Sequence, residues 1–207
     1  MAPENTTDPT ASVARFRELL RIPTVSDADD SRTDPAPFDE FHAALARLYP
    51  GLHGVLEREV VARHSLLYLW RGTTDGDPLV LMAHIDVVPV VEAEWDHPPF
   101  AAELIGAGAD AAIHARGAID DKGSLVAILE AVEQLVAEGF TPVRDVYLAF
   151  GHNEETAGDG AQQIVAVLER RGVRPALVLD EGGAVVDGVV PGSPCRPRWS
   201  GSPNAAS

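Results

Sequence analysis

The spacing of apolar residues changes along this chain, from a helical period to short apolar runs. Residues 12–20 and 38–49 carry apolar side chains every three or four positions, which predicts two amphipathic helices. Residues 54–62 and 65–70 are rich in Val, Leu and Tyr, and they predict two strands that pair as antiparallel neighbours. The first third of the chain is therefore expected to hold two helices and a two-stranded ladder.

After a Gly- and Pro-containing turn at residues 72–78, predicted strands alternate with predicted helices. The strand at 79–82 is short and wholly apolar, as expected at the centre of a sheet, and the helix at 123–138 has one apolar side. The predicted elements are a strand at 79–82, a helix at 123–138, a strand at 143–150, a helix at 160–171 and a strand at 176–179. This order predicts an α/β fold with a central sheet and helices on both faces.

Acidic residues and one histidine cluster next to these predicted elements. Three clusters follow the carboxyl ends of predicted strands, where open α/β sheets bind their ligands, and a fourth precedes the helix at 123–138. The clusters are His84 with Asp86, Asp120 with Asp121, Glu154 with Glu155, and Asp180 with Glu181. Any one pair alone is explained by a solvated loop or by helix capping, but the shared placement of all four favours one binding site.

Such a cluster of carboxylates implies a cation. Two like charges at ~4 Å repel by about 4 kcal/mol at an effective dielectric constant of ~20, so converging carboxylates either take up protons or hold a cation. One imidazole with several carboxylates suits Zn²⁺, with Mn²⁺ or Co²⁺ as substitutes. The single cysteine, Cys195, excludes an internal disulfide framework and a cysteine-rich zinc site.

Composition narrows the classes of partner. The 207 residues include 32 acidic and 16 basic side chains, for a formal charge of −16, and this balance argues against nucleic acids and anionic membrane surfaces. The first ten residues lack the charged and apolar regions of a signal peptide, and the apolar runs are too short to span a bilayer. We therefore expect a cytoplasmic protein that binds neither nucleic acids nor membranes.

Four ordered motifs resemble those of the M20 metallopeptidases, and they are closest to the carboxypeptidase S and N-acyl-amino-acid hydrolase branch. They are Ala83-His84-Ile85-Asp86-Val87-Val88-Pro89, Ala115-Arg116-Gly117-Ala118-Ile119-Asp120-Asp121-Lys122-Gly123, Gly151-His152-Asn153-Glu154-Glu155 and Leu179-Asp180-Glu181-Gly182-Gly183. The resemblance implies a zinc-exopeptidase-like central sheet and a metal-dependent hydrolase of peptide or N-acyl-amino-acid amide bonds.

The resemblance also implies the metal ligands. Asp120 is expected to bridge two Zn²⁺ ions, His84 and Asp180 to complete the protein ligands of one ion, and Glu155 to serve the other. Two ions are typical of the family, and one or two are expected here, with Co²⁺ or Mn²⁺ as possible replacements.

Two further residues receive catalytic roles through the resemblance. Glu154 is expected to be the general base, which takes a proton from the attacking water and passes it to the leaving amine. Asp86 is expected to orient the imidazole of His84 without binding the metal itself. The family also typically has a cis peptide bond after its bridging aspartate, here between Asp120 and Asp121. Lys122 is expected to form an ion pair with a nearby carboxylate.

The sequence departs from the family beyond this region. We expect a disordered N-terminus at residues 1–10, the N-terminal part of an M20 catalytic domain at 11–192, and a disordered or out-of-family tail at 193–207. Family members continue into a lid domain and end with a histidine ligand, whereas no histidine follows His152 here. The chain is thus interpreted as truncated, weak or inactive alone, and without lid-mediated dimerisation. The alternatives are a non-catalytic metal-binding or interaction protein, and an unstable frame-shifted pseudogene product.

Overall fold

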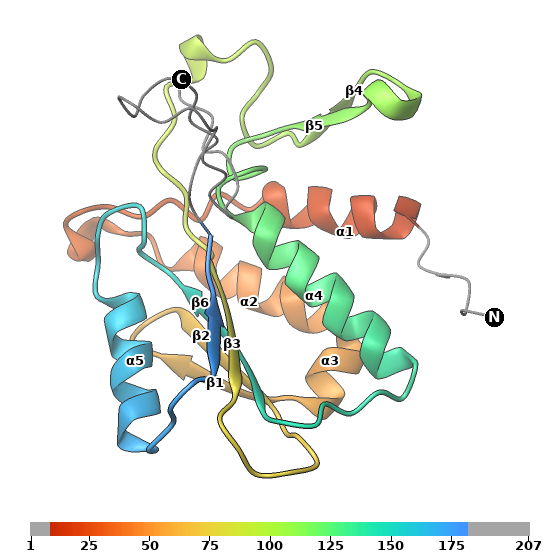
Figure 1. Cartoon of the computed structure of the whole chain (residues 1–207). Helices are drawn as coiled ribbons and strands as arrows, with labels where there is room; N and C mark the ends of the chain where they lie inside the picture. Colours follow the sequence, from red (N-terminus) through yellow and green to blue (C-terminus); the bar gives the residue numbers. More distant parts are fainter. Residues whose placement is uncertain (1–8, 182–207) are drawn as a thin grey trace, which may run out of the picture.

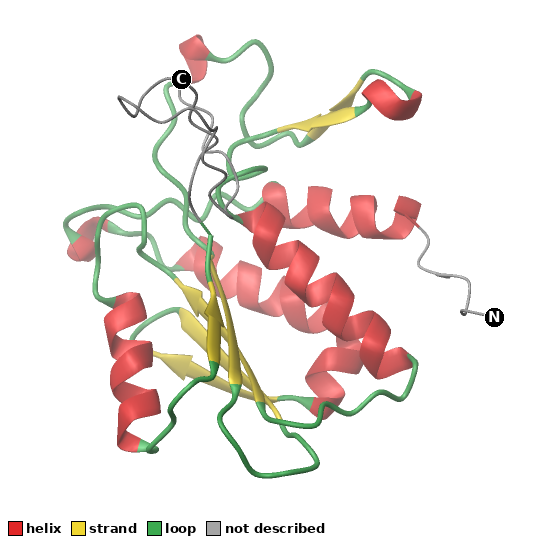
Figure 2. Ribbon diagram, in the orientation of Figure 1, coloured by secondary structure: helices red, strands yellow, loops and turns green. Residues whose placement is uncertain are grey.

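The computed structural model of this chain describes residues 9–181, and it has the predicted α/β fold (Figure 1). The boundaries expected near residue 10 and residue 192, and the tail at 193–207, concern segments that lie wholly or partly outside the described residues, and they stay predictions. A central sheet separates one group of helices from a single helix on the other side (Figure 2).

The central sheet has five strands in the order β1-β2-β6-β3-β7. β1 and β2 pair antiparallel, as expected, and β2 also pairs antiparallel with β6. β3 then lies between β6 and β7 and is parallel to both. The strands are β1 (Glu57–Val61), β2 (Ser65–Trp70), β3 (Leu79–His84), β6 (Val146–Gly151) and β7 (Leu177–Leu179). The carboxyl ends of the three parallel strands therefore meet at one end of the sheet.

Helices cover both faces of the sheet, because its central strands are apolar on both sides. In β2, Leu66, Tyr68 and Trp70 belong to a core cluster that includes residues of the four helices on one face. The alternate residues Leu67 and Leu69 pack in a second cluster with the helix on the other face. The four helices are α1 (Pro9–Leu20), α2 (Ala36–Leu48), α3 (Pro50–Val55) and α4 (Lys122–Ala137), and the single helix is α5 (Gly160–Arg170).

Local differences from the predicted elements have identifiable causes. The helix predicted at 38–49 ends at Leu48, and Pro50 then begins the short helix α3, so the strand predicted from residue 54 starts only at Glu57. Glu133 of α4 stabilises this helix start, because its carboxylate accepts hydrogen bonds from the backbone N–H groups of Gly51 and Leu52 at 2.9 and 2.6 Å. This cap comes from a residue more than 80 positions away in the chain.

The segment between β3 and α4 projects beyond the end of the sheet and contains a small hairpin that the apolar pattern did not predict. Its strands, β4 (Glu103–Ile105) and β5 (Ala112–His114), pair antiparallel as a separate two-stranded sheet. Single turns of 3₁₀ helix occur at η1 (Asp30–Arg32), η2 (Glu92–Glu94) and η3 (Gly108–Asp110).

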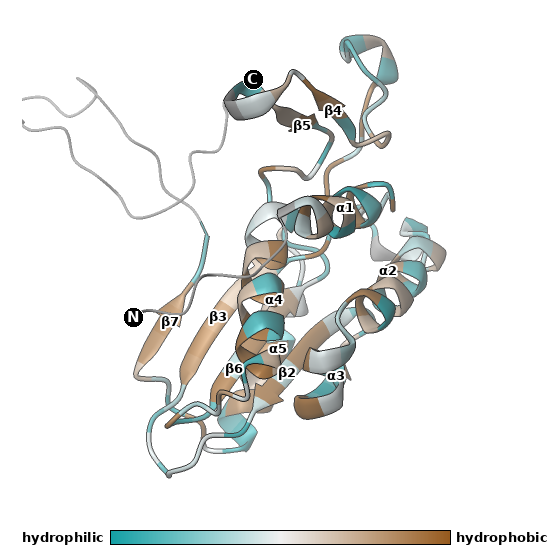
Figure 3. Cartoon of the chain, turned by 90° about the vertical axis from the view of Figure 1, so that its right-hand side faces the viewer, coloured by the Kyte–Doolittle hydropathy of each residue, from teal (hydrophilic) through white to brown (hydrophobic). Residues whose placement is uncertain are grey.

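β7 forms one edge of the sheet among the described residues. Its three residues are apolar, yet Leu177, Val178 and Leu179 are 60, 46 and 55% exposed (Figure 3). None of the helices within residues 9–181 is long and apolar enough to cross a membrane.

The helix α4 is expected to contribute strongly to stability through Leu129, which is fully buried in the larger core cluster. Leu129→Ala should lower the free energy of unfolding by ~2–5 kcal/mol, because it leaves a cavity against the sheet. Val165→Ala on α5 is the control, since Val165 is 49% exposed, and it should change this free energy by at most ~0.5 kcal/mol. Urea unfolding followed by circular dichroism measures both, and equal effects would contradict this packing.

Candidate metal centre

The four acidic clusters lie at the carboxyl end of the parallel strands. His84 is the last residue of β3, two residues beyond the predicted end of that strand. Glu154 and Glu155 follow β6, Asp180 and Glu181 follow β7, and Asp120 lies two residues before α4 begins. Parallel pairing of β3 with both neighbours brings these loops together, although they are far apart in sequence.

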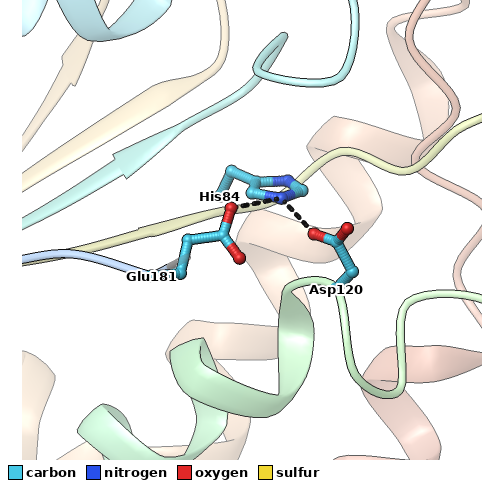
Figure 4. Close-up of side chains that lie close together, drawn as sticks. All are labelled: His84, Asp120 and Glu181. Carbon is cyan, nitrogen blue, oxygen red and sulfur yellow. Dashed lines mark hydrogen bonds and ion pairs between the residues drawn. The ribbon is translucent and has the colours of Figure 1, made fainter. Parts of the chain in front are cut away.

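Three side chains of these clusters converge: His84, Asp120 and Glu181 (Figure 4). One ligand atom from each lies within 4.8 Å of the other two. His84 Nε2 is 2.9 Å from Asp120 Oδ1 and 3.4 Å from Glu181 Oε1. Within residues 9–181, no other group of three His, Cys, Asp or Glu side chains has this proximity.

The resemblance implies Asp180 as the ligand after β7, and this assignment stays a prediction. The side chain that the structure brings near His84 is that of Glu181. Asp180 is exposed, and its Oδ1 accepts a hydrogen bond from the Glu181 backbone N–H at 2.9 Å. The acidic pair was visible in the sequence, but no local signal distinguished its two members.

The predicted general base and the predicted second-ion ligand lie beside the trio. Glu154 Oε2 is 3.8 Å from His84 Nε2, and its side chain is 54% exposed, so it faces open space next to the trio. Glu155 is half-buried, and burial followed by the charge of Asp120 raises the pKa of its carboxyl group. Glu155 is thus electrostatically coupled to Asp120, although it is not part of the compact trio.

Asp86 connects the loop after β3 to the loop after β6. It is fully buried, and Ser26 Oγ donates a hydrogen bond to its Oδ2 at 2.6 Å. The backbone N–H groups of Glu154 and Glu155 donate to its Oδ1 and Oδ2 at 3.1 and 3.2 Å. Burial alone would raise the pKa of Asp86, but hydrogen bonds from His84 and Ser26 hold that pKa below its ordinary value. Asp86 therefore fixes the position of the backbone at Glu154 and Glu155.

The imidazole of His84 is oriented by the first motif itself. Its Nδ1 lies 3.0 Å from the backbone oxygen of Asp86 and 3.3 Å from Asp86 Oδ1, which leaves Nε2 directed at the acidic cluster. Burial alone would lower the pKa of His84, but the carboxylates of Asp86 and Asp120 raise it to about 10. Without a cation, a protonated imidazole donates to Asp120; with one, the same Nε2 is the lone-pair donor.

The remaining carboxylates are crowded enough to favour a cation. Burial, then the nearby charges of Asp121 and Asp120, raise the pKa of Glu181 to about 7. Protons or a metal ion can relieve this repulsion equally well in electrostatic terms, and one nitrogen with several carboxylate oxygens is a donor set that suits Zn²⁺. The residues therefore fit a divalent cation.

The two residues after Asp120 anchor the loop that carries it. The Asp120–Asp121 peptide bond is cis, as the resemblance implied. Asp121 is buried, and its Oδ2 accepts a hydrogen bond from the backbone N–H of His84 at 3.1 Å. The expected ion pair of Lys122 was wrong: its fully buried Nζ instead donates to the backbone oxygens of Ile22 and Leu19 at 2.7 and 3.3 Å. Burial lowers the pKa of Lys122 to about 7.

Comparison with known proteins finds relatives that match most of the chain. A model of peptidase family M20/M25/M40 matches residues 80–198, more than half of the chain. The chain is 43% identical over 182 residues to the N-fatty-acyl-amino acid synthase/hydrolase PM20D1.1 of Danio rerio, which covers 86% of this chain and 34% of that protein. It is 42% identical over 174 residues to the probable carboxypeptidase S-like 2 of Dictyostelium discoideum, covering 81 and 33% of the two chains.

Solved structures show the same fold. The M20 family metallo-carboxypeptidase Sso-CP2 of Sulfolobus solfataricus superposes with a TM-score of 0.62 at 25% identity, over 84% of this chain and 38% of that one. Human carnosine dipeptidase 1 gives a TM-score of 0.66 at 17% identity with the same coverage. The chain spans about a third of the length of the curated relatives that it matches.

The adjacent residues Asp180 and Glu181 allow a matched test of the metal ligand. Glu181→Gln should weaken Zn²⁺ binding by more than ~100-fold, because loss of a direct ligand exceeds the ~10–100-fold typical of supporting residues. Asp180→Asn should change the affinity by less than about threefold, since its carboxylate faces away from His84. Competition against a chromophoric chelator measures both affinities, and the reverse order would restore Asp180 as the ligand.

Asp86→Asn tests whether the buried carboxylate positions the site. An amide has a single acceptor oxygen, so it cannot receive the N–H groups of Glu154 and Glu155 and the Ser26 hydroxyl together. Zn²⁺ affinity should fall by ~10–100-fold. The exposed Asp96→Asn is the matched control and should leave the affinity unchanged. An Asp86→Asn protein that binds Zn²⁺ as the parent does would contradict the positioning role.

Proposed function

This chain belongs to peptidase family M20/M25/M40, and we propose that its site serves zinc-dependent hydrolysis of an amide bond in a small peptide or an N-acyl amino acid. The observation that carries the proposal is the convergence of His84, Asp120 and Glu181, with the carboxylate of Glu154 3.8 Å from the same imidazole nitrogen. A metal-dependent hydrolase needs a cation site and, next to it, a carboxylate that can act as the general base.

His84, Asp120 and Glu181 would hold the first ion, and Asp120 with Glu155 would serve a second. When bound, Zn²⁺ supplies a Lewis acid that polarises the scissile carbonyl and lowers the pKa of water. Support for the second position is that burial, and then the charge of Asp120, raise the pKa of Glu155, so a cation between the two carboxylates would relieve this repulsion.

Glu154 is the residue best placed to move the proton. Its backbone N–H is held by Asp86, while its carboxylate is more than half exposed and free to contact a water molecule and a substrate. In hydrolysis, Glu154 accepts the proton of the attacking water and then transfers it to the nitrogen of the leaving amine. A fixed backbone with a free carboxylate suits both transfers, because the group must reach two positions in turn.

The substrate class is proposed from the relatives. The names of the two relatives refer to N-fatty-acyl-amino acids and to a carboxypeptidase, and both substrate classes place an amide bond next to a free carboxylate. We infer that this chain acts on amides of that kind. Metal binding without turnover would instead favour the alternative of a non-catalytic metal-binding protein.

Glu154→Gln tests the catalytic assignment. With Zn²⁺ supplied, hydrolysis of N-acetyl-leucine should fall by ~10²–10⁴-fold, because the amide cannot accept a proton, while bound zinc per chain should stay the same. Glu169→Gln, on the exposed side of α5, should retain the parent rate. Amine release and elemental analysis provide the two measurements. Full turnover by the zinc-loaded Glu154→Gln protein would exclude Glu154 as the base.

A further inference from the structure

A cavity of about 270 Å³ lies beside the metal centre, and its lining includes Asp120. The other walls come from the loop before β4, from the end of β5 and from the segment that leads to Asp120, and they include Trp95, Ile113, His114, Arg116 and Ile119. Because Asp120 belongs both to the trio and to the cavity wall, a ligand in the cavity adjoins the position of the cation.

Arg116 supplies a positive charge in this cavity, and no acidic side chain within residues 9–181 forms an ion pair with it. Its guanidinium lies over the ring of Trp95, at 5.1 Å from the ring centroid. Among residues 9–181 it makes no side-chain hydrogen bond or ion pair, and its Nε is buried without a partner. His114 Nδ1, on the same wall, is also buried without a partner within this part of the chain. Buried polar groups are normally satisfied, and the Nε–H of an arginine is always a donor, so the Arg116 guanidinium indicates a missing acceptor.

The backbone presents Arg116 in a fixed position. Its N–H donates to the Pro99 oxygen at 2.8 Å, and the next residue, Gly117, has a φ of +78°. A Cβ on Gly117 would lie 2.8 Å from Val87 Cγ1, so the turn also packs closely against the segment after β3. The turn therefore fixes the backbone of Arg116, and the guanidinium lies over the face of Trp95.

We propose that this cavity binds the carboxylate of the substrate and that Arg116 is its partner, an inference that rests on the proposed function. An arginine offers paired N–H donors that match a carboxylate, and the pair is stronger when it is shielded from water. A fixed positive charge also reduces the repulsion that an anionic substrate meets when it approaches a cluster of carboxylates in a chain of net charge −16.

The apolar part of the lining indicates what accompanies the carboxylate. Trp95 and Ile113 are half-buried, and Ile119 is 55% exposed, although it is a large apolar side chain next to the metal centre. These side chains would cover an aliphatic group attached near the carboxylate. The cavity therefore suits the carboxylate end of an apolar amino-acid residue.

The test compares 4-methylpentanoate with 4-methylpentanamide, which have nearly the same shape but differ in charge. Calorimetric titration of the zinc-loaded protein should show tighter binding of the carboxylate. Arg116→Gln should weaken carboxylate binding by ~10–100-fold and leave amide binding unchanged, since a hydrogen bond to a charged group is lost. Arg116→Lys, which keeps the charge, should recover part of the affinity. Arg71→Gln, at an exposed arginine paired with Glu57, is the matched control.

The outcomes separate this inference from the proposed function. If Arg116→Gln binds the carboxylate within twofold of the parent protein, the inference is overturned, and the carboxylate is held by the metal ion alone. Zinc content and hydrolysis, measured on the same preparations, then still decide the proposed function independently. A change in tryptophan fluorescence without a change in carboxylate affinity would mean that Arg116 only packs on Trp95, and this result also overturns the inference.

Discussion

The buried carboxylate of Asp86 is the constraint on which the site depends. It receives the Ser26 hydroxyl and the backbone N–H groups of Glu154 and Glu155, and it lies 3.3 Å from His84 Nδ1. A charge in the interior is costly unless hydrogen bonds satisfy it, and here the donors come from three separate segments. The requirement to solvate one carboxylate thus sets the relative positions of the imidazole and of the exposed Glu154.

The three consecutive ionisable residues at the start of α4, Asp120, Asp121 and Lys122, make different contacts. Asp120 faces His84 and the cavity, whereas Asp121 turns inward and accepts the His84 backbone N–H. Lys122 is buried over the ring of Phe41, and it donates to the backbone oxygens at the end of α1. The two inner charges hold the helix start against α1 and β3, so Asp120 is presented on a rigid base rather than on a free loop.

The parts of the fold that the sequence predicted are those encoded locally. The strands that contain Leu81 and Leu148 were recognisable because helices cover both faces of the sheet, which makes each strand a continuous apolar run. The helix start at Pro50 was missed because its cap, Glu133, lies on another helix. The acidic clusters could be placed together because three of them follow the carboxyl ends of strands. Which member of the pair Asp180 and Glu181 lies near His84 depends on the path of the chain after β7, and neighbouring residues do not encode that path.

The trio at the end of the sheet also links metal binding to folding. His84, Asp120 and Glu181 are distant in sequence, and they meet only when β3 has paired with β7 and α4 has docked. An unfolded chain cannot offer the three donors together, so a cation binds the native state preferentially and shifts the folding equilibrium toward it by mass action. β7 has only three exposed apolar residues to hold it at the edge. The bound ion would therefore stabilise the pairing of this short strand with β3.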